Sequence, residues 1–181
     1  MLAGPGGDCG KTFVAIGLAA AWRKKNIRIA PFKKGPDYID AAWLTLAAGV
    51  PARNLDTWMI DPRTVLRSFI NNAAPDGISL VEGNRGLYDG EGAKGVHSSA
   101  ELSKLLKTPI ILIIPAVKVT RTAAALALGL KIMDPQVEIA GIILNRVANA
   151  RQERVIRESI EAHVGLPIFG ALFPAWHSQH D

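Results

Sequence analysis

The first residues that could do chemistry lie in the glycine-rich segment GPGGDCGKT, residues 4–12. A short apolar segment, Leu2 and Ala3, precedes it, and an expected helix at Phe13–Lys25 follows directly. This order is typical of a phosphate-binding loop, in which backbone N–H groups and the amino terminus of a helix hold an anion. In such a loop, Lys11 contacts the terminal phosphates and the hydroxyl of Thr12 binds Mg²⁺.

Two features of this loop depart from the usual pattern. Its first glycine, Gly4, stands one position further from the lysine than the general motif places it. The second departure is Asp8, because a carboxylate inside an anion-binding loop repels the anion. We therefore expect weak phosphate binding unless Asp8 points outward, is protonated, or pairs with Lys33 or Lys34. A glycine-rich turn with an accidental GKT triplet is the alternative interpretation of the segment.

Four acidic residues stand at or just after the ends of expected strands: Asp37, Asp40, Glu82 and Asp89. Ligands of open α/β sheets bind at the carboxyl ends of the strands, so these carboxylates are expected near the phosphate loop. Mg²⁺ is usually held by one or two carboxylates together with phosphate oxygens. The pattern predicts that at least two of the four bind metal, although a solvated loop carboxylate is the alternative for any one alone.

Other polar residues lie at the same predicted edge of the sheet. Lys33 and Lys34 follow the expected strand Ile27–Phe32 and could neutralise phosphoryl or carboxylate charge, with a surface lysine as the alternative for one of them. Asn145 lies just beyond another strand and could hydrogen-bond adenine; a turn-forming asparagine is the alternative. Cys9 has no neighbouring histidine to make a catalytic pair, so we interpret it as a structural part of the loop.

Helical and extended patterns alternate along the chain. The expected helices are Phe13–Lys25, Ala41–Ala48, Pro62–Asn72, Ser98–Lys107, Thr120–Met133 and Ala150–Val164. The expected strands are Leu2–Ala3, Ile27–Phe32, Ile78–Val81, Pro109–Ile114, Val137–Leu144 and Pro167–Leu172, whereas Pro51–Met59 reads as irregular. This alternation predicts an α/β fold, a P-loop NTPase with a mainly parallel sheet flanked by helices.

Composition limits the function classes. A chain of 181 residues with 49% hydrophobic and 20% charged residues fits one α/β domain. The net charge is +5, but the lysines and arginines form no long block and no aromatic residues interleave with them. We therefore expect an anionic small-molecule substrate rather than nucleic acid. The single cysteine excludes an internal disulfide and fits the cytoplasm, and no segment reads as membrane-spanning.

The segments KKGPDYID, NLDTWM, EGNRGLYDG and ILNRV, in this order behind the GKT loop, resemble the cobyrinate a,c-diamide synthases. The nickel-sirohydrochlorin a,c-diamide synthases share these blocks. The resemblance runs from Gly4 to about Ala171 and implies a dethiobiotin synthetase-like ATP-binding domain. It also implies ATP-dependent amidation of the a and c carboxylates of a cobyrinate-type tetrapyrrole through acyl phosphates, in cobalamin biosynthesis.

In that family a glutamine amidotransferase domain follows and supplies ammonia. We therefore expect residues 1–181 to be a fragment without this domain, dependent on free ammonium, and we note a homodimer as possible. The rival functions are nickel-sirohydrochlorin a,c-diamide synthase, dethiobiotin synthetase and cobyric acid synthase. The GPDYID and NLDTWM blocks argue against dethiobiotin synthetase. A nucleotide-switch ATPase of the cell-division or partition kind is the non-biosynthetic alternative; such proteins usually have an earlier loop lysine, which this loop lacks.

The resemblance also implies roles for individual residues. ATP and Mg²⁺ would be bound by the loop residues Gly4, Gly6, Gly7, Cys9, Gly10, Lys11 and Thr12, with Asn145 at adenine. The metal would be held by Thr12, Asp37, Asp40 and Glu82. Lys33 would face the reacting carboxylate and the γ-phosphate, and Asp89 would assist phosphoryl transfer. Tyr38 and Ile39 would help to place the macrocycle.

Overall fold

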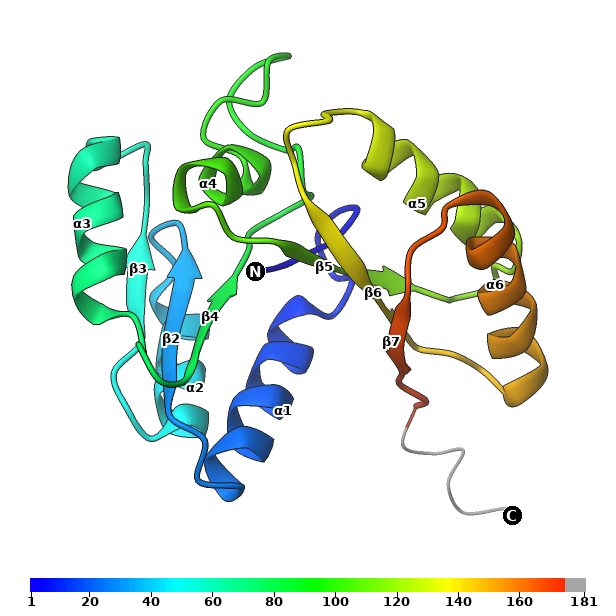
Figure 1. Ribbon diagram of the computed structural model, residues 1–181, viewed down its shortest axis with the longest axis horizontal. Coiled ribbons are helices and arrows are strands. Elements are labelled where there is room, and N and C mark those ends of the chain that lie inside the picture. The colour runs from blue at the N-terminus through cyan, green and yellow to red at the C-terminus, as the bar shows by residue number, and fades with distance from the viewer. Residues whose placement is uncertain (175–181) are drawn as a thin grey trace.

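In the computed structural model, which describes residues 1–174, a seven-stranded sheet runs through the middle of the protein (Figure 1). The strand order is β3-β2-β4-β1-β5-β6-β7, and every pairing in it is parallel. The strands are β1 (Leu2–Ala3), β2 (Ile29–Lys34), β3 (Arg53–Leu55), β4 (Ile78–Glu82), β5 (Ile110–Pro115), β6 (Ile139–Asn145) and β7 (Ile168–Ala171). The predicted parallel α/β sheet is confirmed.

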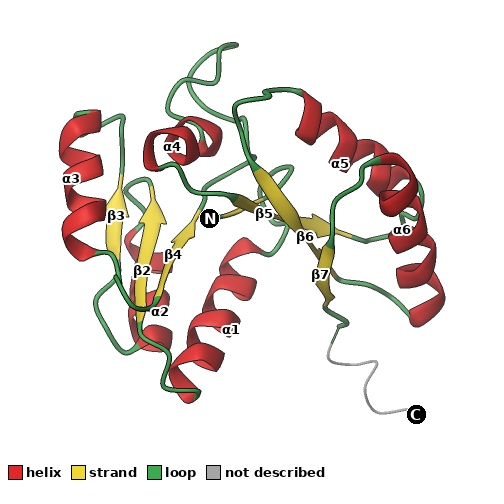
Figure 2. Ribbon diagram, in the orientation of Figure 1, coloured by secondary structure: helices red, strands yellow, loops and turns green. Residues whose placement is uncertain are grey.

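Helices cover both faces of this sheet (Figure 2). They are α1 (Lys11–Lys24), α2 (Tyr38–Ala48), α3 (Pro62–Asn72), α4 (Ser99–Leu106), α5 (Thr122–Ile132) and α6 (Ala150–His163). One core cluster packs α1 and α2 against the sheet, through residues such as Val14 and Leu44. The other packs α3 to α6 against the opposite face, through residues such as Val65 and Ile156. Strands buried between two such layers are nearly continuous in apolar residues, as β5 is.

The ends of the helices differ in a way that matters for ligand binding. Asp37, Asp61, Ser98 and Asn149 each cap a helix with a side-chain oxygen that accepts a backbone N–H. At the start of α4, for example, Ser98 Oγ accepts the backbone N–H of Glu101 at 3.3 Å. Helix α1 instead starts after Gly10 with no side-chain cap. Its first N–H groups are left for an anion.

Three local expectations were wrong. Lys33 and Lys34 lie within β2 rather than after it, because the strand runs to Lys34 instead of ending at Phe32. The segment expected to be irregular contains β3, a three-residue strand held by its pairing with the end of β2 rather than by a pattern of its own. Helix α2 begins at Tyr38 instead of Ala41, because Asp37 accepts the backbone N–H of Asp40 and starts the helix three residues earlier. No helix among residues 1–174 is long and apolar enough to cross a membrane.

Candidate functional site

The glycine-rich loop joins β1 to α1 and is packed tightly at both ends. A Cβ atom at Gly4 would overlap Cys9 Sγ and the carbonyl oxygen of Ile113. Gly10 has a φ of +97° and leaves no room for a Cβ atom beside the amide nitrogen of Asn145. Cys9 is buried, as its interpretation as a structural part of the loop requires. The sequence therefore needs glycine at both positions to close this loop.

Lys11 lies over its own loop. Its Nζ donates to the carbonyl oxygen of Gly6 at 2.8 Å and is 3.4 Å from Cys9 Sγ. Asn145 fastens the loop from β6, because its Nδ2 donates to the Cys9 carbonyl at 3.0 Å while its Oδ1 accepts the N–H of Arg146 at 2.9 Å. Both ends of the Asn145 amide are thus engaged within the chain, and its contact with adenine stays a prediction.

Asp8 sits at the mouth of the loop. It is exposed and has a φ of +52°, and it lines the same cavity as Lys11 and Thr12. Within the described residues its carboxylate makes no hydrogen bond or ion pair. The expected alternative in which Lys33 neutralises it is wrong, because Lys33 is committed to other carboxylates.

Lys33 is the centre of the polar cluster next to the loop. The register of β2 and β4 places it opposite Glu82, and its Nζ lies 2.8 Å from Glu82 Oε1 and 2.6 Å from Asp40 Oδ2. Thr12 Oγ1 donates to the same Glu82 oxygen at 2.5 Å and lies 3.2 Å from Asp40 Oδ2. Asp37 Oδ2 is further out, 3.8 Å from Lys33 Nζ. Residues from four segments therefore converge at the strand ends, as the sequence predicted.

Burial makes the charges in this cluster interdependent. Lys33 is 2% exposed and Glu82 is fully buried. Burial by itself would lower the pKa of Lys33, but the carboxylates of Glu82 and Asp40 outweigh it and raise that pKa. Burial raises the pKa of Glu82 despite the ammonium beside it. For Asp40, burial is outweighed by the hydrogen bond from Lys33, which lowers the pKa. Removing one partner would leave an uncompensated buried charge.

The cluster fits a magnesium ion that arrives with a nucleotide. Glu82 Oε2 is buried without a hydrogen-bond partner, so one carboxylate oxygen is available for a cation. Among residues 1–174, no three His, Cys, Asp or Glu side chains are grouped so as to hold a metal on their own. Mg²⁺ commonly takes only one or two carboxylates and completes its shell with phosphate oxygens and water. Glu82, Asp40 and the Thr12 hydroxyl suit that mode of binding.

The remaining predicted residues lie around this cluster rather than in it. Asp89 is exposed, and its Oδ2 accepts the backbone N–H of Gly86 at 2.9 Å, which closes the turn after β4. Its part in phosphoryl transfer stays a prediction. Tyr38 and Ile39 are largely exposed in the first turn of α2, directly after Asp37. They are therefore accessible to a large ligand beside the cluster.

Two cavities meet at the loop. The polar one, about 410 Å³, is lined by the loop and by Lys33, Asp40 and Glu82. The apolar one, about 810 Å³, contains Phe13 and Val117, which sequence reasoning missed. Both are large apolar side chains left exposed, and only the fold reveals that they face one cavity. The two cavities share Gly10, Phe13 and Arg146, so a charged compartment opens directly into an apolar one.

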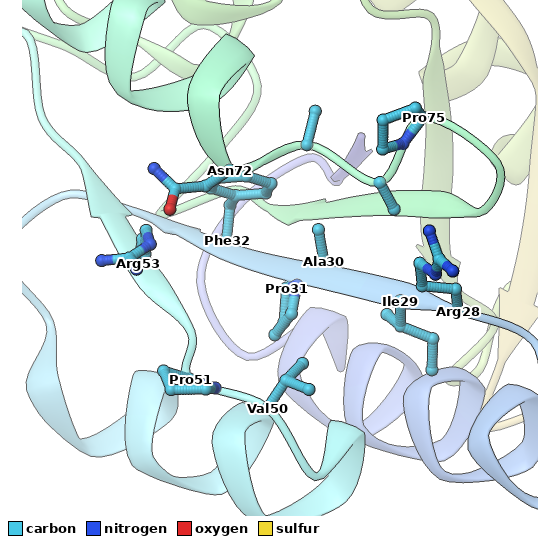
Figure 3. A pocket seen from close by; sticks show the side chains of 12 residues that line it. Arg28, Ile29, Ala30, Pro31, Phe32, Val50, Pro51, Arg53, Asn72 and Pro75 are labelled. Carbon is cyan, nitrogen blue, oxygen red and sulfur yellow. The ribbon is translucent and has the colours of Figure 1, made fainter.

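A third cavity, about 360 Å³, lies beside the amino-terminal half of β2 (Figure 3). It exists because β3 pairs only with Phe32–Lys34, so the outer edge of β2 is uncovered around Ala30 and Pro31. Arg28 lines it at the start of that strand. This end of the sheet is opposite the phosphate loop, and the cavity is therefore separate from the site.

Comparison with known families agrees with this geometry. Residues 1–175 match the family described as the CobQ/CobB/MinD/ParA nucleotide binding domain. The chain belongs to this family. The nucleotide-binding α/β fold that we predicted from the loop and the alternating elements is thereby confirmed.

Named relatives support the resemblance seen in the sequence. The chain is 44% identical over 163 residues to a cobyrinate a,c-diamide synthase of Magnetococcus marinus. The match covers 90% of this chain and 35% of that relative. It is 42% identical over 173 residues to a hydrogenobyrinate a,c-diamide synthase of Streptomyces coelicolor, covering 95% and 35%. The chain thus spans about a third of the length of these relatives.

Solved structures show the same fold at low sequence identity. Chloroplast FtsY from Physcomitrella patens has a TM-score of 0.62 at 14% identity, and the match covers 93% of this chain and 56% of FtsY. The hydrogenase maturation factor HypB from Archaeoglobus fulgidus has a TM-score of 0.59 at 12% identity, covering 94% of this chain and 80% of HypB. At sequence identities this low, the structural matches show a shared fold and nothing more specific.

Proposed function

We propose that this chain is the ATP-binding part of a ligase that amidates the a and c carboxylates of a cobyrinate-type tetrapyrrole. The observation that carries the proposal is the convergence of Thr12, Lys33, Asp40 and Glu82 beside the phosphate loop. This cluster offers a cation and metal-binding oxygens at one point, which transfer of a phosphoryl group to a carboxylate requires. The names of the relatives supply the substrate class.

The proposed reaction has two steps. A carboxylate does not react with ammonia directly, because its leaving group would be oxide. A carboxylate oxygen therefore attacks the γ-phosphorus of ATP, the bond to the bridging oxygen breaks, and ADP leaves an acyl phosphate behind. Ammonia then attacks the acyl carbon, loses a proton, and displaces inorganic phosphate to give the amide. Most of the catalysis lies in positioning the reactants and neutralising charge.

The residues divide this work. The N–H groups of the loop and Lys11 hold the phosphates. Lys33, at the centre of the cluster, contacts both the γ-phosphate and the reacting carboxylate. Thr12, Asp40 and Glu82 would hold Mg²⁺, with Asp37 at its edge; the ion would neutralise charge on the phosphates. In this proposal Asp89 assists phosphoryl transfer, Asn145 contacts adenine, and Tyr38 and Ile39 place the macrocycle.

The partners belong to the same proposal. The ammonia comes from a glutamine amidotransferase domain, as the sequence resemblance implies, and the use of ATP fits a cytoplasmic location. Homodimer formation stays a prediction. A nickel-sirohydrochlorin is the alternative macrocycle, since those synthases share the same sequence blocks.

A nucleotide-switch ATPase is the second candidate, because the family description includes MinD and ParA. The two functions differ in what triggers ATP turnover. We expect ADP release in the presence of ammonium only when cobyrinate, hydrogenobyrinate or nickel-sirohydrochlorin is added, and the most active of the three identifies the substrate. Lys33→Met is the matched negative control. If ADP is released at the same rate with and without the macrocycle, and the chain dimerises when ATP is added, the chain is a nucleotide switch instead.

A further inference from the structure

A second group of charged residues lies at the end of β2, next to the cluster around Lys33. Successive residues of a strand face opposite sides of a sheet, so Lys34 is on the other side from Lys33. Its register partner is Leu55, and Asp56 follows at the end of β3. Among residues 1–174, the Lys34 ammonium makes no side-chain hydrogen bond or ion pair. Lys34 is thus half-buried, with its ammonium unpaired in this part of the chain.

Asp56 is the acidic member of this group and is incompletely satisfied. It is 9% exposed. Its Oδ1 accepts the backbone N–H of Trp58 at 2.9 Å, whereas its Oδ2 is buried without a hydrogen-bond partner. The turn that it closes leaves the Trp58 side chain 69% exposed. An apolar ring surface is thereby exposed in the turn directly after Asp56.

Arg85 links this group to the phosphate cavity. It lines that cavity from the loop after β4, and in the described part of the chain its guanidinium has no hydrogen bond or ion pair. The loop that carries Arg85 runs beside the end of β2, because a Cβ atom at Gly35 would lie 3.2 Å from Asn84 Nδ2. Burial lowers the pKa of Lys34, Asp56 acts in the opposite direction, and the Arg85 and Lys33 cations lower it further. Lys33 is paired with Asp40 and Glu82. Lys34 and Arg85 then carry two positive charges against the single carboxylate of Asp56, which leaves one positive charge uncompensated. One ligand carboxylate would neutralise it.

The loops that carry these residues are tied together. Asn54 Nδ2 donates to the carbonyl oxygens of Gly35 and Asp37, at 2.7 and 3.0 Å, which joins β3 to the turn after Lys34. The His97 ring nitrogen Nδ1 lies 3.0 Å from Thr57 Oγ1, which joins the turn at Trp58 to the loop after β4. The group is therefore held on a connected frame rather than on independent loops.

We propose that Lys34 and Arg85, supported by Asp56 and flanked by Trp58, form a subsite for a second, non-reacting carboxylate arm of the substrate. The inference rests on the proposed function, because only a substrate with several carboxylates can occupy the Lys33 cluster and this subsite at once. An apolar macrocycle ringed by carboxylates matches two free cations and an exposed tryptophan in the turn that Asp56 closes. Lys34 and Arg85 thus select the substrate, while Lys11 binds the nucleotide and Lys33 serves the reacting carboxylate and the γ-phosphate.

The test is a comparison of binding affinities measured by calorimetry. Lys34→Met and Arg85→Met should each weaken cobyrinate binding about tenfold, the scale of one charge-assisted hydrogen bond. Because Lys34 does not line the phosphate cavity, Lys34→Met should leave the dissociation constant of Mg·ATP within twofold of the parent chain. Arg28→Met is the matched control, since it removes one positive charge from the other end of β2 and should change neither. Lys34→Arg keeps the positive charge and should bind cobyrinate with the affinity of the parent chain.

A second probe separates this inference from the proposed function. Fully methyl-esterified cobyrinate, which has no free carboxylate, should bind the parent chain and the Lys34→Met variant equally. Arg85 is exposed, so its variant keeps the test valid if loss of Lys34 impairs folding. Unchanged cobyrinate affinity in both variants, or weakened Mg·ATP binding by Lys34→Met with unchanged cobyrinate binding, would overturn the subsite while leaving the proposed function standing. If the parent chain binds Mg·ATP but not cobyrinate, the proposed function fails and the subsite fails with it.

Discussion

Replacing Asp8 with glycine is expected to strengthen ATP binding. The carboxylate lines the phosphate cavity, and no cation among residues 1–174 neutralises it. Two unit charges ~6 Å apart repel by about 3 kcal/mol at an effective dielectric of 20 and by about 0.7 kcal/mol in bulk water. Because Asp8 is exposed, the effect lies toward the lower value. A gain of about 1.4 kcal/mol, or about tenfold in affinity, is the expected result.

Asp8→Asn separates charge from backbone conformation. The φ of +52° lies in the left-handed region, which favours glycine but which aspartate and asparagine tolerate better than most residues. If repulsion is the cause, the asparagine variant reproduces most of the gain. If only the glycine variant gains, backbone strain is the cause.

The measurement is isothermal calorimetry of Mg·ATP binding at two salt concentrations, with Mg²⁺ held in constant excess. Added salt should narrow the difference between the parent chain and Asp8→Asn, since screening weakens interactions between exposed charges. Equal or weaker ATP binding by both variants would refute the reasoning. Asp8 would then not weaken ATP binding, and its place in the loop would be an adaptation of this chain.

The other predictions concern single side chains. Glu82→Gln should abolish Mg²⁺-dependent turnover, and near-normal turnover would contradict the metal assignment. The same change should lower the free energy of unfolding in urea by about 2 kcal/mol, because Lys33 keeps only one close carboxylate. Asp89→Asn should slow phosphoryl transfer in single-turnover assays more than it weakens Mg·ATP binding, and the reverse order would make Asp89 a nucleotide-binding residue. The hydrogen bond from Lys104 lowers the pKa of Asp134 from its ordinary 3.8, so this pair stabilises the fold above that pH and ceases to do so as pH falls through the lowered value. Asp134→Asn should therefore cost about 0.5 kcal/mol at pH 7 in urea unfolding and progressively less between pH 5 and 3; a constant difference would exclude the ion pair as its source.

Patterns within a single element predicted the fold well. The amphipathic helix α6 was expected at Ala150–Val164 and ends at His163, and α3 has the expected bounds. Local chemistry at the helix start also located the phosphate loop. By contrast, β3 was missed because its three residues are held by pairing with β2, which no local pattern encodes.

The site was predictable where it depends on strand ends. Because parallel strands end at one edge, Asp40 and Glu82 were expected near the phosphate loop and Lys33 at the same edge, and all three lie there in contact. Which partner each charge selects was not predictable, since side-chain packing decides it. Lys33 pairs with Asp40 and Glu82 rather than with Asp8, and the Asp89 carboxylate closes its own turn.

The central claim is that ATP activates a substrate carboxylate, and oxygen transfer tests it most directly. Cobyrinate labelled with ¹⁸O in its carboxylates is incubated with the chain, Mg·ATP and ammonium, and the phosphate released is analysed by mass spectrometry. An acyl phosphate passes one carboxylate oxygen to phosphate, so the account predicts one ¹⁸O in the phosphate for every amide formed. Turnover that releases only unlabelled phosphate would mean that water, and not the carboxylate, attacks ATP, and would contradict the account.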